Sequence, residues 1–139
     1  MHPPVLLFVL LTLSACTAHE DRFRDLVEVD TIDAVVLHNN RGDYRLTREE
    51  LRRFKGVLGD MWYRPQADLK MGTIGFSLYI QGQQYEAVSR THGRYLSVPH
   101  QLVPPAKQHL LARPSSQADA PLIFEFDSAV NLDNYHARR

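Results

Sequence analysis

The chain has 139 residues, of which 16 are basic and 16 acidic, so its formal net charge at neutral pH is zero. This balance lacks the basic excess that nucleic-acid binding requires, and nucleic acid is therefore not expected as a partner. The single cysteine excludes an intramolecular disulfide, while 44% hydrophobic residues are enough for the core of one domain.

The N-terminal 16 residues carry the clearest motif. Residues 5–15 form an uncharged apolar run of 11 residues. A membrane-spanning helix needs about 20 residues, whereas the apolar core of an export signal has about 7–15. Small residues follow the run, as a cleavage site requires, and Cys16 comes directly after them. The sequence therefore predicts an export signal over residues 1–15.

Leu13-Ser14-Ala15-Cys16 resembles the lipobox of bacterial lipoprotein signal peptides. The resemblance implies cleavage between Ala15 and Cys16 and a lipid, such as diacylglycerol with further acyl chains, on Cys16. In Gram-negative members of this family, aspartate after the cysteine retains the protein in the inner membrane. Thr17 stands here instead, which implies the outer membrane facing the periplasm; in a Gram-positive host the anchor would be in the plasma membrane.

The chain after the signal divides by composition into three parts. Residues 16–30 are charged and lack a clear period, so they are interpreted as the lipidated cysteine and a tether in which a helical turn can form. Residues 31–127 are expected to form a single α+β domain. Residues 128–139 are expected to be a C-terminal tail that is frayed.

The first elements of the domain are a hairpin and a helix. Residues 32–38 are rich in β-branched side chains and predict a strand, followed by a turn and a short returning strand over 44–46. The motif Thr47-Arg48-Glu49-Glu50 is typical of a capping box at a helix start. Apolar residues then recur at helical spacing as far as a stop at Gly59: Leu51, Phe54, Val57, Leu58 and Met61.

A loop over 62–71 precedes the strongest strand pattern. Residues 73–80 alternate, with Ile74, Phe76 and Leu78 on one face and Tyr79 on the other. Segments 84–90 and 94–98 are expected to complete a three-stranded meander. A short helix over 106–112, a polar loop over 113–121 and a last strand over 122–126 follow. The predicted fold is α+β: an antiparallel sheet of about five strands with one main amphipathic helix packed on one face.

No motif in the chain names a reaction. The histidines have no metal-ligand spacing, no nucleophile motif is present, and the carboxylates Glu86 and Glu125 are the only pair singled out for acid–base chemistry. No metal, cofactor or catalytic residue is therefore expected. Aromatic and Arg side chains often anchor protein interfaces. The candidate interface residues are Trp62, Tyr63, Arg64 and Tyr79.

The leading hypothesis is a lipid-anchored, non-enzymatic module of the cell envelope that binds another envelope protein. One alternative is an immunity or inhibitor lipoprotein that acts against a periplasmic toxin or lytic enzyme. A second alternative is a small envelope hydrolase or ligand binder, which predicts a polar pocket with converging carboxylates or histidines.

Overall fold

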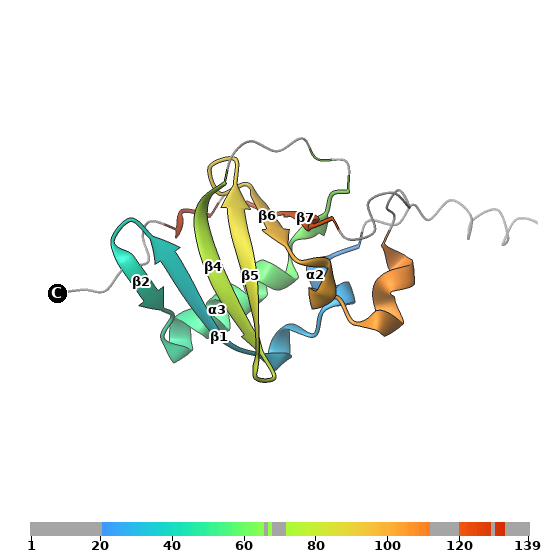
Figure 1. The fold of residues 1–139 in the computed structure, drawn as a ribbon, viewed down its shortest axis with the longest axis horizontal. Helices are drawn as coiled ribbons and strands as arrows, with labels where there is room; N and C mark the ends of the chain where they lie inside the picture. The colour runs from blue at the N-terminus through green and yellow to red at the C-terminus, as the bar shows by residue number, and fades with distance from the viewer. Residues whose placement is uncertain (1–20, 66, 68–71, 112–119, 129, 133–139) are drawn as a thin grey trace, which may run out of the picture.

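The computed structural model describes residues 21–65, 67, 72–111, 120–128 and 130–132 (Figure 1). These residues form an α+β fold, as predicted, in which strands dominate. The helical elements are α2 (Phe23–Leu26), α3 (Arg48–Gly59) and the 3-10 turns η1 (Val29–Thr31), η2 (His100–Leu102) and η3 (Pro105–Leu110). The strands are β1 (Ile32–Asn39), β2 (Gly42–Arg45), β3 (Trp62–Tyr63), β4 (Gly72–Ile80), β5 (Gln83–Arg90), β6 (Tyr95–Val98) and β7 (Leu122–Glu125).

All seven strands belong to one antiparallel sheet with the order β2-β1-β4-β5-β6-β7-β3. The predicted β4–β5–β6 meander and the β1–β2 hairpin are confirmed. The predicted number of strands, about five, was too low. The strand missed outright is β3, which lies in the segment predicted to be a loop. Two residues show no alternation of their own, and β3 is recognised as a strand through its pairing with β7.

The helix α3 begins as the sequence predicts. Thr47 Oγ1 accepts a hydrogen bond from the Glu50 amide at 3.2 Å, and Glu50 Oε1 accepts one from the Thr47 amide at 2.9 Å. Phe54 and Leu58 are buried, and the Phe54 ring stands edge-on to Phe76 of β4 at 6.0 Å. Val57, predicted in the same apolar stripe, is 37% exposed. The stripe that packs on the sheet is therefore narrower than predicted.

The N-terminal boundary of the domain lies earlier than predicted. Residues 21–30 belong to the segment interpreted as a tether, yet Phe23, Leu26 and Val27 are buried in the core. The Phe23 ring packs edge-on against Phe124 of β7 at 5.1 Å. The tether prediction was therefore wrong from residue 21 onward. The pattern misled because only one turn of α-helix is present, too short to display a period.

The C-terminal boundary of the domain lies later than predicted. The amide of Val130 donates to the Gly93 carbonyl at 3.1 Å, and Leu132 is 1% exposed. The predicted tail is thus packed on the domain at least as far as residue 132, while residues 133–139 lie outside the described part. The predicted helix over 106–112 is a 3-10 segment, η3, with Pro105 at its start.

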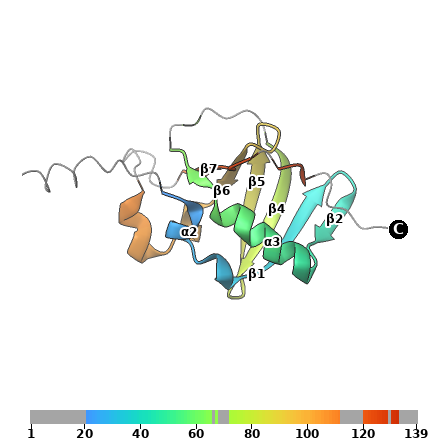
Figure 2. The same cartoon turned by 180° about the vertical axis from the view of Figure 1, so that it is seen from behind.

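The two faces of the sheet differ. α3 covers one face, as Figure 2 shows, and the core lies between α3 and that face. The opposite face, here named the open face, has no described helix over β1, β4 and β5 (Figure 1). Because directly paired residues point to the same side, the register assigns to it Val36, His38, Ser77, Tyr79, Glu86 and Val88 in the centre and Glu125 and Trp62 at the β7–β3 edge.

Candidate functional site

The predicted interface residues lie in three different places in the structure. Trp62 pairs with Glu125 and lies on the open face, whereas Tyr63 pairs with Phe124, points to the core and is only 7% exposed. Tyr63 packs on Phe124 at 5.5 Å. Successive residues of a strand face opposite sides, so its inclusion in an exposed surface with Trp62 was wrong. Tyr79 lies on the open face, but on β4, four strands away from β3.

Trp62 and Arg64 belong to a group drawn from four separate segments. This Trp62 cluster consists of Arg22, Trp62, Arg64, Arg94 and Glu125. The guanidinium carbon of Arg22 lies 3.9 Å from the centre of the Trp62 ring, and that of Arg64 lies 5.7 Å from it. Both distances fall within the range of cation–π attraction. Glu125 Oε1 accepts from Arg64 Nε at 3.0 Å, and Oε2 accepts from Arg94 Nε at 2.9 Å.

Glu125 is the electrostatic centre of this cluster. Burial by itself raises the pKa of its carboxyl group, since only 18% of its side chain is exposed. The hydrogen bonds from Arg94 and Arg64 and their positive charges outweigh burial, so the net effect is a pKa below the ordinary value. Glu125 is therefore ionised at neutral pH and holds the two guanidinium groups in place.

A hollow of about 390 Å³ adjoins this group. Its lining consists of Trp62, Arg64, Arg94, Glu125, Phe126, Asp127 and Ser128. Each arginine uses Nε on Glu125, and among the described residues no hydrogen bond engages the terminal amino groups of Arg64 or Arg94. Guanidinium groups with unused N–H donors suit carboxylates and phosphates. The arrangement can therefore recognise an anionic group beside an indole ring.

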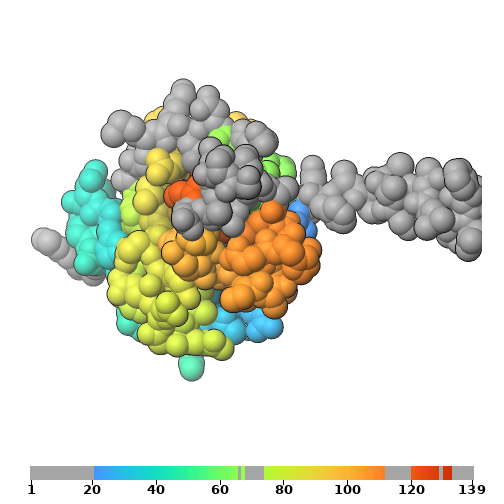
Figure 3. Space-filling view, turned by 45° about the vertical axis from the view of Figure 1, so that its right-hand side comes forward, coloured from blue at the N-terminus to red at the C-terminus, as the bar shows by residue number. Residues whose placement is uncertain are grey.

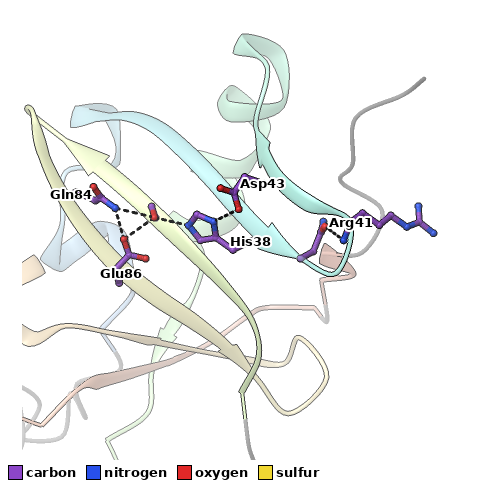
Figure 4. A network of polar contacts seen from close by, with 7 residues as sticks. His38, Arg41, Asp43, Gln84 and Glu86 are labelled. Atoms are coloured by element: carbon purple, nitrogen blue, oxygen red, sulfur yellow. Dashed lines mark hydrogen bonds and ion pairs between the residues drawn. The ribbon is translucent and has the colours of Figure 1, made fainter.

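A second polar group occupies the centre of the open face (Figure 4). The two ring nitrogens of His38 contact Asp43 Oδ1 at 2.7 Å and Ser77 Oγ at 2.8 Å. Ser77 Oγ donates to Glu86 Oε1 at 2.8 Å and accepts from Gln84 Nε2 at 3.3 Å. Since the hydroxyl proton goes to Glu86, His38 must donate to Ser77.

The Asp43–His38–Ser77 order resembles the connectivity of a hydrolase triad, but its surroundings favour a structural role. Ser77 is 1% exposed, beneath His38, Gln84 and Glu86. A nucleophile has to reach the substrate, and its hydroxyl proton has to pass to the histidine. Here the hydroxyl is enclosed and donates to Glu86 instead. The network cross-links β1, β2, β4 and β5.

The carboxylates singled out in the sequence do not converge. Glu86 contacts Ser77 on the central strands, whereas Glu125 contacts Arg64 and Arg94 at the edge. Within the described ranges, no group of three or more His, Cys, Asp or Glu side chains is placed to hold a metal ion.

Another cavity, of about 490 Å³, is lined by residues of α2–η1, the β4–β5 hairpin and η2–η3. Figure 3 draws a side of the molecule on which β5 (yellow) and η3 (orange) are in view. The apolar lining of the cavity includes Leu26, Ile80, Tyr85 and Leu102. Among the described residues that line it, Glu28 is the only acidic one and there is no histidine. This cavity therefore does not supply the converging carboxylates or histidines that the hydrolase alternative predicts.

The predicted lipidation and cleavage residues, Cys16 and Ala15, lie outside the described residues. In the part of the chain that the structure describes, no helix has the length and apolar character needed to cross a membrane.

Comparison with known proteins adds no assignment. The chain matches no protein-family model, and no match was found among curated proteins or solved structures.

Sequence reasoning found Trp62 and Arg64 but missed Arg22, Arg94 and the pairing role of Glu125. The alternation of residues 122–126 could have placed Glu125 away from the core. No local pattern could have brought Arg22 to Trp62, because their contact depends on an isolated bridge between the two residues.

Proposed function

We propose that this chain is a lipid-anchored cell-envelope protein, held to the outer membrane through Cys16, that binds another envelope protein through the open face. The observation that carries the binding proposal is the face itself: a seven-stranded sheet that α3 covers on one side and no described helix covers over β1, β4 and β5 on the other. No catalytic role is proposed.

The anchor is supported by the lipobox resemblance and by the position of the domain along the chain. Among the described residues, the first that belongs to the core is Phe23, seven positions after Cys16. Several acyl chains anchor a protein stably, whereas one chain alone binds only marginally. A short connection would hold the domain close to the membrane surface.

The binding role is supported by the chemistry of the central strands. Val36, Tyr79 and Val88 are partly exposed apolar or amphipathic side chains on the open face. Next to them, hydrogen bonds fix His38, Ser77 and Glu86. A surface whose polar groups are already ordered loses less conformational entropy when a partner binds. Partly exposed aromatic groups beside ordered polar groups are typical of protein interfaces.

The anchor is tested by Cys16→Ser in cells that are fed a labelled fatty acid. Loss of the label and accumulation of uncleaved precursor are the expected results. Persistent labelling of the Cys16→Ser protein would refute the anchor.

The binding surface is tested by replacing Tyr79 with a photoreactive phenylalanine analogue in intact cells. A matched control has the same analogue at Arg52, whose side chain is 71% exposed on α3, on the other side of the sheet. One dominant protein adduct is expected from position 79 and not from position 52. Equal adducts from both positions, or none from position 79, would contradict the proposed surface.

A further inference from the structure

The Trp62 cluster lies where the chain enters the folded domain. Arg22 forms a β-bridge with Trp62, and the Tyr63 amide donates to the Asp21 carbonyl at 2.8 Å. The strand β3 is thereby fastened to the first described residues of the chain. Whatever holds the residues before Asp21 therefore holds the Trp62 cluster nearby.

The cluster contains three guanidinium groups and one carboxylate, which gives it a net charge of +2 at neutral pH. Asp60 Oδ1 is closer to Arg24 (2.6 Å) than to Arg22 (3.5 Å), so Arg24 and Asp60 form the tighter ion pair. Asp127 is a further carboxylate in the hollow beside Trp62, and including it leaves the group positive. An anionic partner is therefore favoured at this edge of the sheet.

The geometry also suits a phosphate group beside an indole ring. Glu125 fixes the Nε atoms of Arg64 and Arg94 and leaves their terminal amino groups for other acceptors. Such groups bind phosphate oxygens in pairs. Trp62 is half-buried between the sheet edge and Arg22. Indole rings are enriched at the headgroup level of membranes, where one side of the ring is apolar and the N–H is hydrated.

Chain length brings this edge within reach of the bilayer. Four residues lie between Cys16 and Asp21, so the five steps from one Cα to the next span at most about 17 Å when fully extended. The headgroup layer on each side of a bilayer is about 5–8 Å thick. A lipidated Cys16 at the base of that layer would keep Asp21, and with it Trp62, within roughly 10 Å of its outer edge.

We propose that the Trp62 cluster docks on the anionic phospholipid headgroups of the membrane that holds Cys16, with phosphate oxygens bound by Arg64 and Arg94. This inference rests on the proposed lipidation. Docking at the β7–β3 edge would fix the orientation of the domain relative to the membrane.

The test uses the full lipidated protein, purified and reconstituted into vesicles. Trp62 is the only tryptophan, so its fluorescence reports the site alone. In vesicles of phosphatidylglycerol and phosphatidylethanolamine we expect emission at shorter wavelength, quenched by lipids brominated near the headgroup. In phosphatidylcholine vesicles, or at high salt, where exposed charges are screened, the shift should be smaller.

The matched variants are Arg64→Gln with Arg94→Gln, and a control of Arg48→Gln with Arg53→Gln on α3. Both pairs remove two positive charges. Only the first should lose the fluorescence shift. Circular dichroism verifies that each variant is folded; if the first pair is not, Arg94→Gln alone serves, since its side chain is 62% exposed.

The mass of the purified protein separates the two proposals. Protein without lipid on Cys16 would refute the proposed anchor. Lipidated protein whose Trp62 emission does not depend on phosphatidylglycerol, or whose two double variants respond alike, would overturn headgroup docking. A Trp62 response that occurs only after a protein partner is added would overturn it as well.

Discussion

Replacement of Phe23 by alanine tests whether the first described residues are part of the core. Phe23 is fully buried and packs edge-on against Phe124 at 5.1 Å. Removal of a buried phenylalanine ring costs about 3–5 kcal/mol, of which the aromatic pair accounts for about 0.5–1.5 kcal/mol. Whole domains are stable by only about 5–15 kcal/mol. Phe23→Ala should therefore remove a large part of the stability, although Phe23 precedes the predicted domain.

The assay is urea unfolding of the full chain, followed by circular dichroism. With a slope of about 2 kcal/mol per M, the midpoint should fall by roughly 2 M. Val57→Ala is the matched control, because Val57 is 37% exposed on α3 and such substitutions change stability by about 0.5 kcal/mol or less. If the Phe23→Ala midpoint coincides with that of Val57→Ala, residues 21–27 are a detachable tether and the reasoning is wrong.

Three further outcomes are expected. Because the pKa of Glu125 is lowered in the folded state, its ionised form stabilises the protein above pH 4.5, and this contribution is lost as the pH falls through the folded value. The difference in unfolding free energy between wild type and Glu125→Gln, measured by urea unfolding at several pH values, should therefore shrink toward acidic pH. A difference that does not change with pH would contradict the ion pairs. Gly93→Ala should lower the melting temperature far more than Gly82→Ala. Both glycines have φ near +80°, but a Cβ at Gly93 would lie 2.2 Å from a backbone oxygen, whereas one at Gly82 would meet nothing. Equal melting temperatures of the two variants would disprove that close approach. Ser77→Ala should cost about 1–3 kcal/mol, because it leaves His38 without its buried partner; an unchanged melting temperature would show that the network does not stabilise the sheet.

Local patterns predicted the local elements. The capping box at Thr47 and the apolar spacing up to Leu58 depend on contacts within α3 or with one neighbouring layer. The structure confirms the capping box and the burial of Phe54 and Leu58, but not that of Val57. The alternation through Phe76 and Leu78 similarly describes one strand between a core and an open face. Such signals need no knowledge of which strand lies beside which.

The elements that escaped prediction are those defined by distant partners. β3 is a strand because Trp62 and Tyr63 pair with β7, and Arg64 bonds to a residue 61 positions away. α2 is buried because Phe124 lies against Phe23. A single sequence contains no periodicity that reports such contacts. The same reason explains why Trp62 and Arg64 could be found as candidates, while the partners that complete their site could not.

The late position of β7 in the chain has a consequence for the time at which the protein can fold. Phe124 fills the space between Phe23 and Tyr63, and β7 joins β6 to β3. During synthesis, Phe23 and Tyr63 therefore lack this aromatic partner until residue 124 has been made, whereas α2 and β1 already have α3 and β4 beside them. Folds dominated by such non-local contacts also form slowly. The β6–β7–β3 part of the sheet can therefore form only after nearly the whole chain has been synthesised.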